Sequence, residues 1–233
     1  MNGETTVHGI VLSSMPIGEY DRRVTILTSE RGRITAFAKG ARRPTGAFSA
    51  CTMGFTYAEF TLYEGRDSYT IKSVEKVRFF EEVMGDIEAT YYGMYFCELA
   101  GYLTREDLSE PGQMKLLYLS LLAITRKDIP KELTRCIFEL RSIAISGEAI
   151  RAEGRYYSGK YNGLTDEPLA GSIEVNESTL YTVRYILNTP LKELYSFTVS
   201  EEVLKELKAI CADYMERHVD RQMKSLAVLE TII

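Results

Sequence analysis

The spacing of apolar residues changes once along this chain of 233 residues, and that change constrains the fold more than any other feature. Up to about residue 80, the order of apolar and polar residues has the period of two that is typical of strands. Between residues 33 and 39, for example, Ile34, Ala36 and Ala38 fall on one face of a strand. From Gly85 onward, apolar residues recur every three to four positions, as on one face of a helix. The sequence therefore predicts a strand-rich domain at residues 1–80 and a helical domain at residues 81–233.

Five strands are predicted in the first domain, at residues 7–15, 24–28, 33–39, 53–63 and 69–77. The alternation slips near Ala58 and Glu59, which predicts a bulge or a sheet corner. Five short antiparallel strands of this kind fit a small closed barrel of the OB type.

Helices are predicted at residues 86–104, 113–126, 133–145 and 178–187, and a last helix follows Ser200, which suits an N-cap. Residues 147–175 are rich in glycine and predict an irregular excursion. The predicted fold class is thus α+β: a five-stranded OB-fold barrel followed by a helical bundle domain.

Composition agrees with a globular protein, since 45% of the residues are hydrophobic and 26% are charged. No apolar run approaches the roughly 18 residues that span a bilayer, and the N-terminal residues lack a signal-peptide pattern. We therefore expect a cytoplasmic, nucleoid-associated protein without a membrane partner. The four cysteines are widely separated, which predicts reduced, buried thiols rather than a metal motif.

Charge is unevenly distributed along the chain. The whole chain has a net charge of −5, but residues 22–43 contain seven basic residues and one acidic residue, a local charge of +6. A basic segment on the strands of an OB barrel favours a polyanion, because such barrels bind single-stranded nucleic acid through a cationic groove and aromatic stacking. The candidate DNA-binding residues are Arg33, Phe37, Lys39, Arg42, Arg43, Arg22 and Arg23.

The same segment has a second interpretation, a solvated basic face that prevents strand edges from aggregating. For Phe37 the alternative is the core, where a phenylalanine on a strand more often lies. Arg22 and Arg23 are adjacent on a strand and must point to opposite faces, so at most one of them is expected to join the site.

A second basic segment lies in the acidic part of the chain. Residues 115–145 have six basic and three acidic residues, beside several leucines, which could hold an acidic peptide with apolar anchors. The candidate residues are Lys115, Arg126, Lys127, Lys131, Arg135, Leu116 and Leu119. The alternative is that cations near a helix end simply favour the helix dipole.

Catalytic patterns are scarce. The chain has only two histidines, and it contains no phosphate-binding loop and no nucleophile elbow. The sequence therefore predicts a protein that is not an enzyme, with no cofactor and no bound metal.

The motifs at residues 11–21, 26–33 and 38–43 resemble the N-terminal domain of the RecO family. The run Ala38-Lys39-Gly40-Ala41-Arg42-Arg43 is the most specific of them. Weaker likenesses occur at residues 95–99, at 138–141 and in a single C-terminal helix expected over residues 204–229. The resemblance covers most of the chain.

This resemblance implies an OB fold with a helical domain, and a recombination mediator in DNA repair. It implies binding of single- and double-stranded DNA, annealing of complementary strands, and RecA loading on DNA covered by single-strand-binding protein (SSB). The implied partners are RecR and the acidic C-terminal tail of SSB, and we expect a monomer or weak dimer. Many members have a four-cysteine zinc module after the third helix, but residues 147–171 contain no cysteine here, so no zinc is expected in this excursion. A protein-interaction adaptor with incidental DNA binding remains the alternative.

Overall fold

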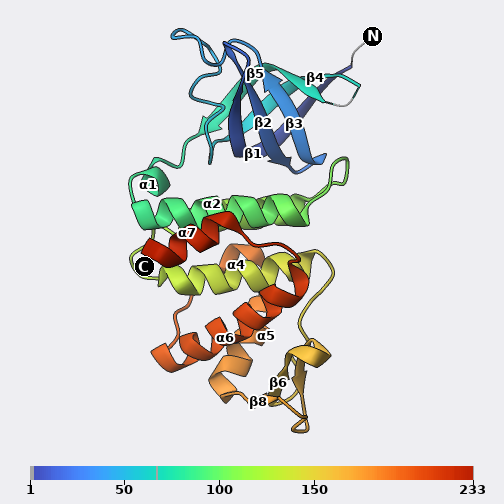
Figure 1. Cartoon of the computed structure of the whole chain (residues 1–233), viewed down its shortest axis with the longest axis vertical. Helices are drawn as coiled ribbons and strands as arrows, with labels where there is room; N and C mark the ends of the chain where they lie inside the picture. The colour runs from blue at the N-terminus through green and yellow to red at the C-terminus, as the bar shows by residue number, and fades with distance from the viewer. Residues whose placement is uncertain (1–2, 67, 233) are drawn as a thin grey trace.

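A closed barrel of five strands sits above layered helices in the computed structural model, which describes residues 3–66 and 68–232 (Figure 1). The strands are β1 (Glu4–Ile17), β2 (Asp21–Thr28), β3 (Gly32–Ala38), β4 (Tyr57–Glu64) and β5 (Tyr69–Arg78). Their order around the barrel is β1-β2-β3-β5-β4. The predicted OB-type barrel is thereby confirmed.

One pairing in the barrel differs from the prediction of antiparallel strands. β3 and β5 run parallel, with Ala36 opposite Tyr69 and Phe37 opposite Thr70. This short contact closes the barrel, because β4 has already paired with β1 and β5. The β4–β5 register shifts between Tyr57 and Glu59, where the sequence predicts a bulge. The fourth strand begins at Tyr57 rather than at residue 53, because the preceding residues form turns.

The helical part contains helices near the predicted positions. They are α1 (Glu81–Met84), α2 (Ile87–Leu103), α3 (Pro111–Ala123), α4 (Lys131–Ile145), α5 (Glu177–Asn188), α6 (Glu201–His218) and α7 (Lys224–Ile232), with short 3-10 turns at η1 (Gly159–Tyr161) and η2 (Leu191–Glu193). Ser200 caps α6 by accepting a hydrogen bond from the Val203 amide. The single C-terminal helix expected over residues 204–229 is wrong. The chain leaves the helix at Val219, and α7 folds back beside α2 (Figure 1).

The excursion between α4 and α5 contains a small sheet of β6 (Tyr156–Ser158), β7 (Gly163–Thr165) and β8 (Ile173–Glu174). Tyr157 anchors it to α6, because the tyrosine hydroxyl donates to Asp213 at 2.6 Å, and Arg217 holds that carboxylate. Gly159 permits the approach, since a Cβ there would overlap Asp213 and Arg217. Side-chain packing and hydrogen bonds thus hold this segment to the helices.

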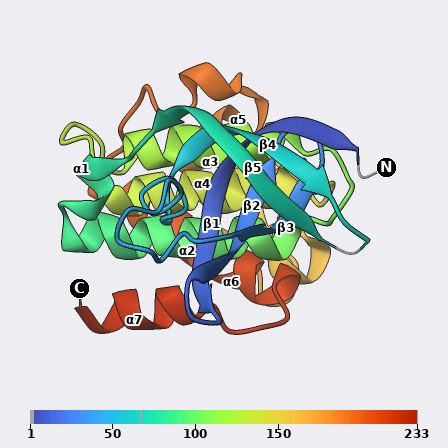
Figure 2. The same cartoon turned by 90° about the horizontal axis from the view of Figure 1, so that it is seen from above.

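Two apolar clusters make up the core. One fills the barrel, and the other fills the helical part and includes Ile10 and Leu27 from the outer face of β1 and β2. Seen from above, the barrel lies over α2, α3 and α4, with α7 along one side (Figure 2). No helix among the described residues is long and apolar enough to cross a membrane.

Candidate nucleic-acid interface

The β2–β3 hairpin separates its side chains into an inner and an outer face. Val24, Ile26, Ile34 and Ala36 point into the barrel core. On the other face Arg23 lies opposite Phe37 in the strand register, and Phe37 remains partly exposed. The predicted alternation of β3 is therefore confirmed, and Phe37 is not part of the barrel core.

The outer row continues across two more strands. Phe37 pairs with Thr70 of β5, and Thr70 pairs with Tyr63 of β4. Tyr63 is 38% exposed. The Lys72 ammonium lies 5.4 Å from the centre of the Tyr63 ring, a cation–π contact. Two aromatic rings and two cations thus share one barrel face. Sequence reasoning missed Tyr63 and Lys72, because only the parallel β3–β5 pairing places them in this row.

The loop after β3 carries the remaining cations beside the β1–β2 hairpin. The Gly40 amide donates to Asp21 at 2.7 Å, and the Arg42 amide donates to the Tyr20 carbonyl at 2.8 Å. The Arg43 guanidinium lies 5.1 Å from the centre of the exposed Tyr20 ring. Lys39, Arg42 and Arg43 are exposed, and they follow the end of β3 in the loop that contacts the β1–β2 hairpin.

Arg33 and Arg22 do not join this cluster. Arg33 is six residues before Lys39 on β3, about 20 Å away along an extended strand, and it donates to the Gly101 carbonyl of α2 at 2.6 Å. Arg22 lies opposite Ala38 and donates to Ser14 at 3.2 Å. Of the two adjacent arginines, Arg23 is the one on the outer face.

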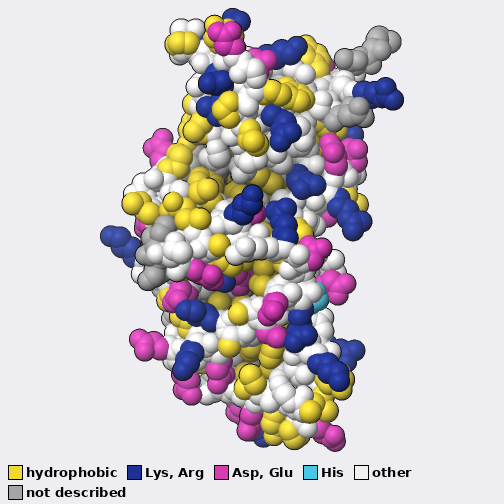
Figure 3. All heavy atoms as spheres, in the orientation of Figure 1, with side chains coloured by type: hydrophobic (Ala, Val, Ile, Leu, Met, Phe, Trp, Pro, Cys, Tyr) yellow, Lys and Arg dark blue, Asp and Glu magenta, His cyan; other side chains and the backbone are white. Residues whose placement is uncertain are grey.

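One cation of the outer face, Lys72, is paired with an acid. Glu4 hydrogen-bonds Lys72 at 2.6 Å and raises the pKa of that ammonium. In the face drawn in Figure 3, acidic side chains are more frequent over the helical half than over the barrel. We name the set Arg23, Phe37, Lys39, Arg42, Arg43, Tyr63 and Lys72 the barrel face.

The predicted basic residues of the helical part are largely paired with acids of the same chain. Lys131 contacts Asp86 and Glu88, Arg126 contacts Asp128, and Arg135 contacts the buried Glu139. Lys115 and Lys127 are exposed at opposite ends of α3. Leu116 has no exposed surface, so of the two predicted apolar anchors only Leu119 reaches the surface.

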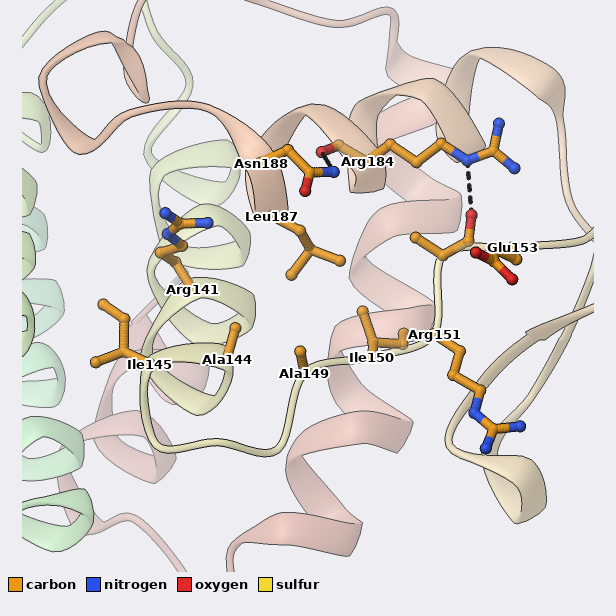
Figure 4. A pocket seen from close by; sticks show the side chains of 11 residues that line it. Arg141, Ala144, Ile145, Ala149, Ile150, Arg151, Glu153, Arg184, Leu187 and Asn188 are labelled. Carbon is orange, nitrogen blue, oxygen red and sulfur yellow. Dashed lines mark hydrogen bonds between the residues drawn. The ribbon is translucent and has the colours of Figure 1, made fainter.

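A cavity of about 780 Å³ lies instead between α4, α5 and the segment that joins α4 to the small sheet (Figure 4). Its apolar lining includes Ile145 and Leu187, and three arginines surround it: Arg141, Arg151 and Arg184. Arg141 donates to the Ile186 carbonyl, but its Nε is buried without a hydrogen-bond partner in the described part of the chain. Burial lowers the pKa of the Arg141 guanidinium, because the charged form is less well solvated there.

The two histidines contact carboxylate, amide and aromatic side chains. His8 lies between Glu30 and Glu59, and His218 contacts Asn162 at 2.9 Å and the Tyr214 ring. Neither contact pairs a histidine with a hydroxyl or thiol nucleophile. As predicted, all four cysteines are buried with free thiols.

A closed barrel with aromatic and cationic side chains on its outer face, joined to a helical part, places the chain among OB-fold proteins. The family model described as "Recombination protein O N terminal" matches residues 1–80, and the one described as "Recombination protein O C terminal" matches residues 84–227. The chain belongs to the RecO family, and this membership supports a role in DNA repair and recombination.

Curated relatives match over nearly the whole chain. The DNA repair protein RecO of Acetivibrio thermocellus is 28% identical over 240 residues, covering 96% of this chain and 95% of that protein. The DNA repair protein RecO of Pelotomaculum thermopropionicum is 30% identical over 237 residues, covering 95% and 91%.

Proposed function

We propose that this protein is a recombination mediator without catalytic activity that binds single- and double-stranded DNA on the barrel face and anneals complementary strands. In this role it assists RecA loading on SSB-coated DNA together with RecR. The observation that carries the proposal is the continuous row of Arg23, Phe37 and Tyr63 with Lys72 across four strands, ending at Lys39, Arg42 and Arg43. Membership of the RecO family supports the same role.

The physical basis of annealing is simple on such a surface. Lysine and arginine neutralise phosphates and release counterions, so two strands approach each other with less repulsion. Contacts to the backbone leave base edges free to pair, since phosphate contacts do not identify sequence. Exposed aromatic rings hold unpaired bases by stacking, which is tolerant of sequence.

A salt series of single-stranded DNA binding tests the proposal. Replacing Lys39, Arg42 and Arg43 together by alanine removes three phosphate contacts, so the slope of log affinity against log salt falls by about 2. A matched control replaces three exposed lysines of the helical part, Lys192, Lys205 and Lys224. Unchanged affinity and slope in the barrel triple variant, or an equal loss in the control, would contradict the assignment.

The helical part is proposed to bind the acidic tail of SSB. The cavity between α4 and α5 supports this, because Arg141, Arg151 and Arg184 surround an apolar lining, and Glu153 is the one acid among the described residues that line it. Arginine pairs well with carboxylates, and the lining offers a site for an apolar anchor. The cations of the predicted set, by contrast, already contact acids at Lys131, Arg126 and Arg135.

Titration with an SSB tail peptide shows whether the tail binds at the cavity between α4 and α5 or at the basic residues near α3. We expect Arg141→Ala combined with Arg184→Ala to weaken binding at least about tenfold, since each lost charged contact costs more than 1 kcal/mol. Lys115→Ala combined with Lys127→Ala is the matched control with the same charge change. If the lysine pair weakened peptide binding more than the arginine pair, the tail would bind along α3. If the unmodified protein did not bind the peptide, this part of the proposal would be removed, and the proposal for the barrel face would be unaffected.

A further inference from the structure

Three side chains with metal-binding atoms meet inside the helical core. Cys136 and Glu139 come from α4, and Cys211 comes from α6. One ligand atom from each, two thiol sulfurs and a carboxylate oxygen, all lie within 4.8 Å of one another. All three residues are buried, with 2% exposure or less.

The Glu139 carboxylate is only half satisfied. Its Oε1 accepts hydrogen bonds from the Tyr95 hydroxyl and from Arg135 Nε, both at 2.7 Å. Its Oε2 is buried and has no hydrogen-bond partner among the described residues. A buried polar atom without a partner is costly, and an absent ion is one of the few reasons for it.

We propose that Cys136, Glu139 and Cys211 bind one divalent metal ion of the zinc type. Thiolate ligands select such soft or borderline ions over magnesium or calcium. Zinc binds sulfur at about 2.3 Å and carboxylate oxygen at about 2.0–2.2 Å, so its tetrahedral ligands lie roughly 3.5–3.8 Å apart. The cluster therefore needs to contract by only about 1 Å.

The charge balance also fits a divalent ion. Two thiolates, one carboxylate and the ion sum to one negative charge, which the adjacent Arg135 neutralises. Arg135 and Tyr95 hold Oε1, which is the outer-shell support that orients ligating carboxylates. Metal binding releases the two thiol protons to the solvent and involves no change of oxidation state.

An entry path and a fourth ligand position are present. Cys136, Glu139 and Cys211 line a cavity of about 420 Å³ between α2, α4, α6 and α7, and water can complete the coordination there. The bound ion would join α4 to α6 and stabilise the helical part by binding only the folded chain. This inference is independent of DNA binding and differs from the sequence-based expectation of no metal. Cys136 and Cys211 lie 75 positions apart in the chain, so they form no local metal motif.

Cobalt titration of the full-length, metal-free protein under a non-thiol reductant tests the site. One equivalent of Co²⁺ should give a sulfur-to-cobalt charge-transfer band and the visible bands of a tetrahedral site, and zinc should displace it. Cys136→Ser and Cys211→Ser should each weaken Co²⁺ binding more than about 100-fold, beyond the 10- to 100-fold typical of losing an outer-shell partner. Cys97→Ser, another buried cysteine of the helical part, is the matched control and should keep the band.

The pH dependence gives a second measurement that does not rely on a variant. Thiols must lose their protons to bind a metal, so protons compete with the ion and the apparent affinity should rise steeply with pH. The other charged or titratable groups around the cluster are Tyr92, Tyr95, Glu132, Arg135, Lys208 and Glu230. No charge-transfer band with the unmodified protein, equal loss in Cys97→Ser, or a Cys136–Cys211 disulfide in place of binding would overturn the proposal.

Discussion

At the residue scale, Phe37 is partly exposed and Tyr63 is 38% exposed on the surface of the barrel. They lie on the outer row of the barrel, two strands apart, with Thr70 between them. We predict that Phe37→Ala and Tyr63→Ala each weaken single-stranded DNA binding by about 1–3 kcal/mol, the usual value of a base stacked on an aromatic ring. The salt slope and double-stranded DNA binding should remain unchanged, because no phosphate contact is lost.

Fluorescence anisotropy with labelled oligonucleotides measures both quantities. Tyr181→Ala provides the control, since Tyr181 is exposed and belongs to α5, which lies on the side of α4 away from the barrel (Figure 1). Affinity equal to that of the unmodified protein in both barrel variants would show that the rings are not stacking platforms.

Gly32 makes a close contact between the barrel and the helical part. Its φ is +59°, and a Cβ would overlap the carbonyl oxygens of Arg105 and Leu108. We predict that Gly32→Ala lowers the free energy of unfolding by at least about 2 kcal/mol, from backbone strain plus this overlap. Gly18 has nearly the same φ, +57°, but open space around it, so Gly18→Ala should cost only about 1 kcal/mol. Urea unfolding of both variants checks this, and equal losses would contradict it.

The sequence predicted which face of a strand the site residues occupy, but it did not predict their contacts with distant elements. Alternation placed Arg33 and Phe37 correctly on one face of β3, because the side-chain period of a strand is two, and Lys39 follows the end of the strand. It could not show that α2 lies under one end of that strand and accepts a hydrogen bond from Arg33. Contacts between residues 68 positions apart depend on packing, which no local pattern encodes.

At the element scale, the start of α2 depends on Asp86. Its carboxylate accepts from the Ala89 amide at 2.9 Å and contacts Lys131 of α4 at 2.9 Å. The Ala89 hydrogen bond, followed by Lys131, lowers the pKa of Asp86. Because the pKa of Asp86 is lowered in the folded state, the charged carboxylate stabilises the fold at pH values above its ordinary pKa of 3.8. This stabilisation is lost as the pH falls through the lowered pKa.

We therefore predict that Asp86→Ala costs about 0.5–2 kcal/mol at neutral pH, and that the difference from the unmodified protein shrinks as pH falls below 3.8. Asp86→Asn keeps the N-cap and loses only the ion pair, so its cost should be smaller. Chemical denaturation across a pH series measures both. A difference that does not depend on pH would exclude the carboxylate charge as its cause.

The sequence did not predict α7 as a separate helix, and its contacts explain why. The amides of Lys224 and Ser225, in its first turn, donate to the two carboxylate oxygens of Glu98 on α2 at 3.1 and 2.9 Å. Such a cap, from a residue more than 120 positions away, leaves no signal near the helix itself. The strands were predictable because alternation is local, whereas the return of α7 and the parallel β3–β5 pairing are tertiary features.

We predict that Glu98→Ala releases α7 from α2, because the first amides of the helix lose their acceptors. Amide hydrogen exchange should accelerate in residues 224–232 and remain slow in α4. Glu202→Ala is a control that removes an exposed glutamate of α6, elsewhere in the helical part. Unchanged protection of α7 in Glu98→Ala would show that apolar packing alone, through Leu229, holds it in place.

At the scale of the whole molecule, the barrel and the helices share a core. Ile10 and Leu27 belong to β1 and β2, yet both are fully buried in the helical cluster. The division of the sequence at residue 80 therefore separates two kinds of secondary structure, while apolar contacts cross it. We expect the two parts to unfold together in one cooperative transition, since neither can expose this surface without loss of stability.

Two neighbouring residues allow a direct test of this coupling. Ile26 points into the barrel core, and Leu27 points into the helical core. Ile26→Ala and Leu27→Ala should each cost about 2–5 kcal/mol, and each should lower the midpoint of a single thermal transition. The decisive measurement is helical circular dichroism of Ile26→Ala. If the parts unfold together, the helices melt at the lowered temperature although no helical contact of Ile26 has been removed, whereas a helical midpoint unchanged from the unmodified protein would show that the barrel unfolds independently.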